Sequence, residues 1–439
     1  MRLFTAGWFF LLLLTPVAVR AETSWPQFRG PDGQGHSRAV GVPLRWSEKE
    51  NIVWKTPIVG RGWSSPVVEN GKIWLTTAIE QAATPEERER GLASVPKTGQ
   101  YEVVGRVEMF AICLDAKTGR ILRQIKLTES DDPEPIHPLN SFASPTPVVE
   151  AGRVYCHFGT YGTFCLDTVS GQVLWQRQLR IRHYVGPGSS PILYKNLLIL
   201  TCDGADRQYV AALDKHTGEI VWQRDRPPLR TDNPDFKKSF STPLIIRVAG
   251  RDQCVVPGPQ WVVAYDPASG APLWRFDHGN GFSLAPRPVY DGRCVFICTG
   301  FGRTSLLAIR VDAAGAGDVT ASHIAWRSRK QVPRRPSPIV VGGRVLSVSD
   351  MGILTCYDAA TGEAIWHKRM PGNFSASPLA VDGRLYFSNQ EGRTTVLAPG
   401  DTYQELAQND LDGQIMASLA VVDNDLLLRT DTHLYRIGE

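Results

Sequence analysis

The segment Asp167–Trp175, with the sequence DTVSGQVLW, is one copy of the motif that decides the fold of this chain. The motif reads Asp-x-x-(Thr/Ser)-Gly-x-x-x-Trp, and each copy stands between two apolar-rich runs. The other copies are Asp115–Arg123, in which Arg replaces Trp, Asp214–Trp222, Asp266–Trp274 and Asp358–Trp366. Because Asp can bond the turn backbone and Gly accepts a positive φ, each copy predicts a hairpin turn followed by a strand that carries the Trp.

A second feature recurs along the chain, namely Ser or Thr followed by Pro and a short β-branched run. Its prolines are Pro66, Pro147, Pro191, Pro243, Pro288, Pro338 and Pro378, and Leu419 takes the same place in a last copy. Together the two features predict an all-β closed propeller of about eight four-stranded blades, with the Trp rings wedged between neighbouring blades. A seven-blade ring is the alternative if the unit around Gly315 forms no full sheet.

The first and last units depart from the regular spacing. Residues 80–106 form a charged insertion in the first blade, where Thr84–Arg90 predicts a short surface helix capped by Thr84. The last unit ends after Leu434 and Tyr435, whereas Asn51–Lys55 is an orphan strand near the other end that carries a Trp. We therefore expect this N-terminal strand to complete the last blade and close the ring.

The first 21 residues predict a signal peptide. Arg2 precedes an apolar run from Phe9 to Leu14, and Ala21 ends a small-residue cleavage site. Cleavage near Ala21 would leave residues 22–439 as a single propeller domain in the periplasm or outside the cell. No later run is apolar for long enough to predict a membrane anchor.

Charge is balanced along the chain. The formal net charge is +4, and Lys and Arg are interleaved with Asp and Glu almost everywhere. A basic tract or strongly basic balance would be typical of a nucleic-acid-binding protein, so we do not expect nucleic acid as a partner.

Three further segments carry a resemblance to a known family. These are Trp25–Pro31 at the start, Asn140–Pro147 and Phe374–Pro378. With the turn motif, they resemble secreted bacterial propeller proteins that have pyrroloquinoline-quinone-like (PQQ-like) repeats. The repeat itself is similar to those of quinoprotein dehydrogenases and of the propeller lipoprotein that assists outer-membrane protein assembly.

The resemblance to the dehydrogenases implies a quinone cofactor with calcium, but two features of the sequence depart from it. The quinoprotein alcohol dehydrogenases carry adjacent cysteines, whereas the closest pair here is Cys294 and Cys298. The calcium-binding carboxylates and the catalytic Asp match no motif in this chain. We therefore assign no catalytic residue and expect no cofactor, with PQQ and calcium as the alternative.

Cysteine and histidine positions indicate structural roles. Cys113, Cys165 and Cys356 share one slot before the turn Asp, and the other five cysteines lie in predicted second strands. We interpret all eight as small buried side chains, with one or two disulfides as the alternative. The histidines have no zinc-site spacing, so no metal site is predicted. The recurring Trp residues are interpreted as core, and Trp63 and Trp261 fall outside their slot.

Propeller topology places two sets of loops on one side, which we call the funnel face. These are the lead-in loops before each inner strand and the loops that join second to third strands. The candidate ligand-binding residues on them are Arg61, Trp63, Asn140, Tyr161, Asp203, Arg207, Gln260, Arg287, Arg303, Arg335, Asp350, Asn373 and Glu391. The arginines either attract an anionic small molecule or glycan, or pair with Asp203, Asp206, Asp350 and Glu391 to hold loops together.

Three functions remain open from the sequence. The leading hypothesis is an exported, non-catalytic protein that binds a ligand or an unknown partner protein. The alternative is a quinoprotein-like oxidoreductase with PQQ in the funnel. A third, polysaccharide hydrolysis, would need a pair of carboxylates, and the candidates are Asp203, Asp350 and Glu391.

Overall fold

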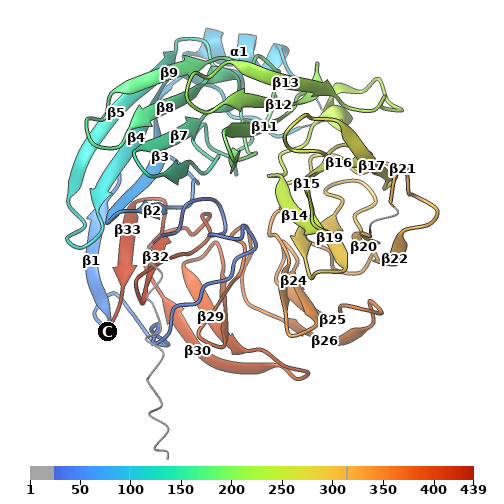
Figure 1. Ribbon diagram of the computed structural model, residues 1–439. Coiled ribbons are helices and arrows are strands. Elements are labelled where there is room, and N and C mark those ends of the chain that lie inside the picture. Colours follow the sequence, from blue (N-terminus) through green and yellow to red (C-terminus); the bar gives the residue numbers. More distant parts are fainter. Residues whose placement is uncertain (1–23, 98, 313–314) are drawn as a thin grey trace, which may run out of the picture.

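The computed structural model describes residues 24–97, 99–312 and 315–439, which form a ring of eight β-sheets around a central axis (Figure 1). Each sheet has four strands in antiparallel order from the axis to the rim, and the fourth sheet adds a fifth, parallel strand. The prediction of an all-β propeller with eight four-stranded blades is confirmed. The predicted signal peptide, residues 1–21, lies outside the described residues.

The strand bounds follow the blades. Blades 1 and 2 contain β2 (Val67–Glu69), β3 (Lys72–Ala82), β4 (Val104–Asp115), β5 (Ile121–Ser130), β6 (Val148–Glu150), β7 (Arg153–His157), β8 (Thr163–Asp167) and β9 (Val173–Arg177). Blades 3 and 4 contain β10 (Ile192–Tyr194), β11 (Leu197–Asp203), β12 (Gln208–Asp214), β13 (Ile220–Asp225), β14 (Leu244–Val248), β15 (Arg251–Pro257), β16 (Trp261–Tyr265), β17 (Pro272–Asp277) and the added β21 (Gly317–Asp318).

Blades 5 and 6 contain β18 (Val289–Tyr290), β19 (Cys294–Cys298), β20 (Leu306–Arg310), β22 (Ile324–Ser328), β23 (Ile339–Val341), β24 (Arg344–Val348), β25 (Ile353–Asp358) and β26 (Ala364–Arg369). Blades 7 and 8 contain β27 (Leu379–Val381), β28 (Arg384–Ser388), β29 (Arg393–Ala398), β30 (Gln404–Asp410), β31 (Ala420–Val422), β32 (Asp425–Arg429), β33 (His433–Ile437) and β1 (Ile52–Pro57).

The unit around Gly315 forms a full blade. Strands β18, β19, β20 and β22 pair in order, so the seven-blade alternative is wrong. This unit lacks the Asp-Gly turn, and its long connection between β20 and β22 instead contributes β21 to the rim of blade 4, where Gly317 pairs with Trp274. The weak repeat signal therefore reflects a different turn and not a missing blade.

Ring closure occurs as predicted. β1 pairs antiparallel with β33, so that the N-terminal strand forms the outer strand of blade 8. The predicted surface helix is α1 (Pro85–Ala93), and Thr84 caps it in a capping box with Glu87. β3 extends to Ala82 and β4 begins at Val104, so the insertion is shorter at both ends than the predicted 80–106.

The turn motif explains how neighbouring blades are joined. In each copy Gly has a positive φ, and in every copy except that of Gly171, which faces Arg123, its missing side chain leaves room for the Trp of the preceding blade. A Cβ at Gly218, for example, would lie 2.5 Å from the Trp175 ring. The indole N–H then donates to a turn carbonyl of that next blade, as in Trp54 to Ala116 at 3.0 Å, Trp175 to Lys215 at 3.0 Å, Trp222 to Pro267 at 3.1 Å and Trp326 to Ala359 at 2.9 Å. The predicted wedge between blades is confirmed, and Arg123 replaces it by donating to Val169.

The cysteines occupy the blade interior. All eight are buried and none forms a disulfide, which confirms their interpretation as small core side chains. Within the described residues, no helix has the length and apolar character that crossing a membrane requires.

The segment before β1 crosses the axis on one side of the ring, as the dark blue trace in Figure 1 shows. We call residues 24–43 the strap. Its main-chain bonds join Trp25 to Val68, Pro26 to Val149, and both Gly35 and Ser37 to Ala380. These partners lie in the inner strands of blades 1, 2 and 7, so the strap covers the side of the channel opposite the funnel face.

We predict that Gly218→Ala destabilises the protein more than Gly71→Ala. Both glycines have a positive φ, but a Cβ at Gly71 meets nothing within 4 Å. The backbone conformation costs each variant about 1 kcal/mol, and overlap with Trp175 adds about 2 kcal/mol to Gly218→Ala alone. Urea unfolding measures the difference. Equal midpoints for the two variants would contradict the role of the Trp contact.

Candidate ligand-binding face

The funnel face is held together by hydrogen bonds between its two sets of loops. In six blades, a side chain from the loop between the second and third strands accepts a backbone N–H from the lead-in loop of the same blade. These pairs are Tyr161 with Glu134, Asp206 with Arg182, Gln260 with Arg230, Asp350 with Arg334, Glu391 with Asn373 and Asp431 with Gln414. In these blades, the two sets of loops that topology predicted to share one side are therefore in direct contact.

A ring of hydroxyl groups surrounds the axis where the inner strands begin. It consists of the residues before the repeat prolines, Ser65, Thr146, Ser190, Thr242, Ser337 and Ser377, and of Ser418, and we call it the axial hydroxyl ring. Its hydroxyls accept backbone N–H bonds from the preceding blade, at 2.9 Å for Ser65 to Thr146 and for Thr146 to Ser190, and at 3.1 Å for Ser418 to Ser65. Arg287 occupies the ring position in blade 5, and its N–H donates to Ser337.

The ring borders a cavity of about 130 Å³ whose lining includes residues of the funnel-face lead-in loops, and we call this cavity the cup. Phe28 of the strap contributes to its lining, as do Trp63, Phe240 and Met416. Arg335 is the charged residue among the lining residues that the structure describes. The cup is therefore a small, hydroxyl-rich recess with one cation at its wall.

Trp63 and Arg335 are the members of the predicted set that line the cup. Each also has a buried donor without a partner in the described structure, Nε1 of Trp63 and Nη1 of Arg335. The Arg335 Nε lies 3.4 Å from Asp350, whose other oxygen is occupied by the backbone N–H groups of Arg334 and Arg335.

Most of the other predicted polar residues are engaged in contacts away from the cup. Arg61 bonds Glu102 and the Asn140 carbonyl, while the Asn140 amide donates to the Val185 carbonyl. The Tyr161 hydroxyl accepts from the Glu134 N–H. These contacts tie the lead-in loops of blades 1, 2 and 3 together. Arg207 packs over Tyr209, and Arg303 is exposed.

The candidate carboxylates for hydrolysis are also engaged. Asp203 forms a fully buried ion pair with Arg226 at 2.7 Å. Asp350 and Glu391 accept backbone N–H groups of their lead-in loops. Such carboxylates hold loops in place, and no pair of them faces the cup among the lining residues described.

Arg287 lies on the opposite side of the ring from the predicted funnel. It is 2% exposed, and its guanidinium donates to the Phe28 carbonyl at 2.5 Å, to Gln27 at 3.1 Å and to the Pro243 carbonyl at 3.0 Å. Burial lowers the pKa of Arg287 to about 10, so the group stays charged at neutral pH. Arg287 therefore fastens the strap beneath the cup.

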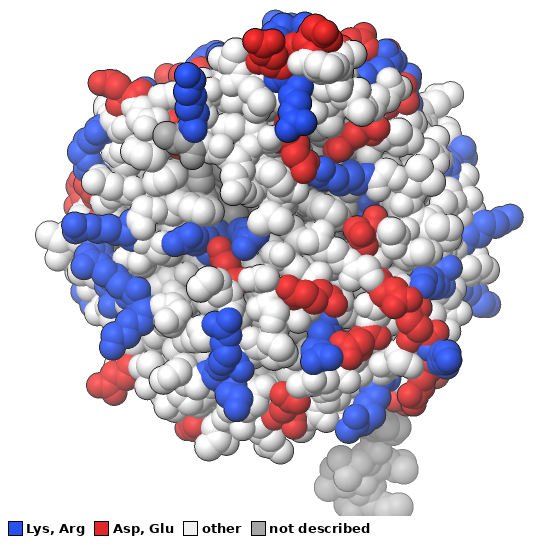
Figure 2. Space-filling model, turned by 180° about the vertical axis from the view of Figure 1, so that it is seen from behind, with Lys and Arg blue, Asp and Glu red and all other residues white. Residues whose placement is uncertain are grey.

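Charges of both signs cover the funnel face. Figure 2 shows basic and acidic side chains intermixed over the side opposite that of Figure 1. A single-sign field would steer a charged partner from a distance, but this pattern does not produce one. Selectivity for charge must therefore come from local geometry, such as that of the cup.

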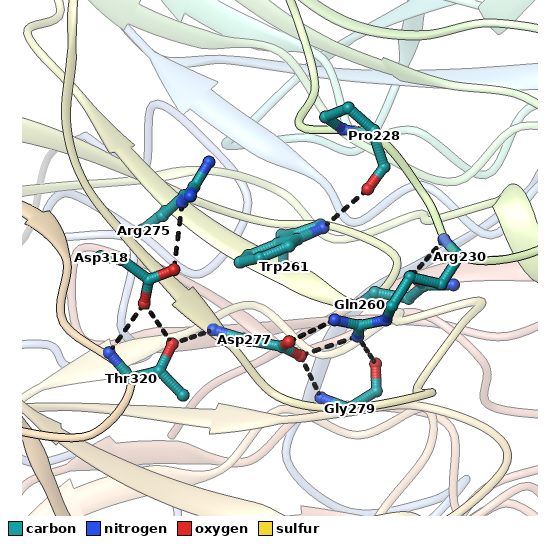
Figure 3. Close-up of polar contacts among 9 residues, drawn as sticks. All are labelled: Pro228, Arg230, Gln260, Trp261, Arg275, Asp277, Gly279, Asp318 and Thr320. Carbon is teal, nitrogen blue, oxygen red and sulfur yellow. Dashed lines mark hydrogen bonds and ion pairs between the residues drawn. The ribbon is translucent and has the colours of Figure 1, made fainter.

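A second and larger cavity of about 390 Å³ lies at the rim between blades 3 and 4. Tyr265, Leu273 and Arg275 line it, together with β21. Figure 3 shows the neighbouring contacts: Arg230 and Arg275 both pack on the Trp261 ring, at 5.5 Å and 5.0 Å from its centroid.

The two arginines of Figure 3 are already neutralised by carboxylates. Arg230 pairs with Asp277, and Arg275 pairs with Asp318 of β21 at 3.3 Å. The Trp261 Nε1 donates to the Pro228 carbonyl. Trp261, which falls outside the repeat slot, therefore helps to fasten the added strand to blade 4.

Sequence reasoning missed the axial hydroxyl ring and Phe28. The signal for the ring was present, since Ser or Thr precedes the proline in six of the repeats, but it was interpreted only as a strand start. Phe28 has no such signal, because its place in the cup depends on the path of the strap across the axis.

The cup does not fit the quinone and calcium implied by the dehydrogenase resemblance. Its volume of about 130 Å³ is below the roughly 300–1,000 Å³ of ordinary small-molecule pockets. Calcium takes several oxygen ligands, with carboxylates foremost. No carboxylate lines the cup, and the described residues contain no group of three or more His, Cys, Asp or Glu that could hold a metal ion.

The blades, their turn motif and the cup define an eight-bladed propeller with quinoprotein-like repeats. The model of the family described as outer membrane protein assembly factor BamB matches residues 82–256 and 314–413. These segments make up more than half of the chain, and the chain belongs to this family.

Solved structures with the same fold are distant in sequence. BamB from Moraxella catarrhalis is 14% identical, with a TM-score of 0.53, and the match covers 83% of this chain and 99% of that one. Quinohemoprotein alcohol dehydrogenase from Comamonas testosteroni is 12% identical, with a TM-score of 0.59 and coverage of 96% and 81%. The computationally designed Ika8 protein is 12% identical, with a TM-score of 0.51 and coverage of 76% and 93%. No curated protein matches the chain.

We predict that Arg287→Ala lowers the free energy of unfolding by about 3 kcal/mol, because it removes several charge-assisted bonds to the strap and to blade 4. Arg287→Ser restores a hydroxyl at the ring position but not the strap contacts. Proteolysis of the strap should be faster in both variants than in the wild type. A strap that stays protected in Arg287→Ala would contradict its anchoring by this side chain.

Stability should also fall as the pH drops from 7 to about 5. Burial lowers the pKa of His157 to about 3 and those of His183 and His278 to about 4. These histidines stay neutral in the folded state but bind protons near pH 6.5 when unfolded. Each histidine therefore lowers the free energy of unfolding by up to about 1.4 kcal/mol per pH unit below 6.5. Urea midpoints at several pH values test this, and a flat profile would contradict it.

Proposed function

We propose that this chain is an exported, non-catalytic binding or assembly protein that holds a ligand or a partner protein on its funnel face. Membership in a family described by an outer-membrane assembly factor supports an assembly role. The predicted signal peptide over residues 1–21 supports export to the periplasm or the cell exterior. Nothing in the charge pattern favours nucleic acid as the partner.

The observation that carries the proposal is that polar side chains on this face form contacts that hold its loops in place. Acid–base catalysis needs a titratable group within reach of substrate. Asp350 and Glu391 instead accept hydrogen bonds from backbone N–H groups of the lead-in loops, and Asp203 is buried in an ion pair with Arg226. Groups arranged in this way make a rigid, shaped surface, which suits recognition better than proton transfer.

A quinoprotein-like oxidoreductase is the rival function. The likeness of its fold to quinohemoprotein alcohol dehydrogenase, with a TM-score of 0.59, favours it. The small cup and the lack of lining carboxylates weigh against it. Because the fold alone serves many functions, the lining residues are the stronger guide.

Titration of the purified mature protein with pyrroloquinoline quinone and calcium separates the two functions. We expect no saturable heat of binding and no dye-linked oxidation of alcohols or sugars above a boiled sample. A known soluble quinoprotein, reconstituted in parallel, serves as the positive control. Saturable binding with turnover would overturn the proposal.

Capture from cell-envelope extract tests the binding face. Immobilised protein with Arg303→Glu and Arg334→Glu, two exposed positions on the funnel face, should lose partners that the wild type retains. The matched control, Lys117→Glu with Arg120→Glu, changes charge equally on the exposed turn between β4 and β5 and should retain them. Loss of the partners from the turn variant alone would place binding elsewhere and contradict the proposed face.

A further inference from the structure

We propose that the cup receives one compact oxyanion, a carboxylate, sulfate or phosphate group of whatever the funnel face holds. The proposal rests on the binding function above and names the chemistry of its ligand. It follows from three properties of the lining residues: the direction of their donors, the one cation and the size of the space.

The donors come from the axial hydroxyl ring. A hydroxyl group has one O–H donor and two acceptor lone pairs. Each ring hydroxyl accepts a backbone N–H from the preceding blade, as Thr242 does from Ser190 at 3.0 Å. Its own hydrogen must then point elsewhere, and the accepted bond makes the O–H a stronger donor.

Five of these hydrogens have no acceptor among the described residues. They belong to Ser65, Thr146, Ser190, Thr242 and Ser418, all of which line the cup. Ser377 differs, since its hydroxyl donates to Ser337. Because the five come from blades 1, 2, 3, 4 and 8, their donors converge on the axis from more than half of the ring.

Arg335 and Trp63 add nitrogen donors at the wall of the same space. The Arg335 side chain is 26% exposed and pairs only loosely with Asp350. Its Nη1 and the Trp63 Nε1 have no partner in the described structure. A small shift of either side chain would turn these donors toward a bound group.

The size of the cup limits its occupant. The volume of about 130 Å³ is below the roughly 300–1,000 Å³ of ordinary small-molecule pockets. This space suits one carboxylate, sulfate or phosphate group better than a three-ring quinone. A wall of converging donors with one guanidinium and no carboxylate selects an acceptor with negative charge over a cation.

The test uses the mature protein labelled with ¹⁵N at the tryptophan indoles. Titration with inorganic sulfate or formate should shift the Trp63 Nε1–H signal saturably, with the signal assigned through Trp63→Phe. Arg335→Gln should weaken this binding at least tenfold, since it removes a charge-assisted bond. The control Arg120→Gln changes an exposed arginine on the turn between β4 and β5, which does not line the cup, and should leave the affinity within twofold.

Three outcomes contradict the proposal. Equal shifts with glucose or glycerol would make the cup a general polar recess. Shifts that persist unchanged in Arg335→Gln would place the anion elsewhere, and no shift with either anion would leave only water in the cup. If the anions bind but the envelope extract yields no partner, the proposed binding function is wrong and the oxyanion site is supported. If a partner is captured but no anion binds, the binding function is supported and the oxyanion site is wrong.

Discussion

The contact between a Trp of one blade and the Gly turn of the next determines the architecture. The ring of Trp175 fills the space that a side chain at Gly218 would need, and its N–H bonds the Lys215 carbonyl. Each such contact joins two sheets that share no strand, so the blades must follow one another at a fixed angle. Blade 5 lacks this turn, so the Trp of blade 4, Trp274, has no Gly turn to pack against. Instead, β21 covers the rim of blade 4, and the Trp274 indole donates to Gln253 of its own blade.

The axis is organised by two further elements that depend on this ring. The axial hydroxyl ring links neighbouring inner strands, with Arg287 bonding the Pro243 carbonyl between blades 4 and 5, and the strap lies across one end of the channel. Arg287 connects these elements, since it replaces a hydroxyl in the ring and binds the Phe28 carbonyl of the strap. The result is a channel covered on one side and recessed on the other, which gives the funnel face its cup.

The sequence predicted the fold more fully than the site. Turn motifs and prolines predicted the blades, their order and the closure by β1, because each is a local pattern repeated many times. The funnel loops were also predicted, since they follow from topology. Which of their side chains face the axis could not be predicted, because this depends on contacts between distant segments. Arg287 is the plainest case: it was grouped with the funnel arginines, yet it contacts Gln27 and Phe28, which are about 260 positions away.

The most direct measurement of the central claim is anomalous diffraction from crystals of the mature protein soaked in bromide. Bromide is a compact anion whose position is shown directly by its anomalous scattering. The protein should bind it in the cup, near the hydroxyls of Thr146, Ser190 and Thr242 and the guanidinium of Arg335. A peak there that is absent from Arg335→Gln crystals is the predicted result. Water alone in the cup, with bromide bound only at the outer surface, would contradict the account.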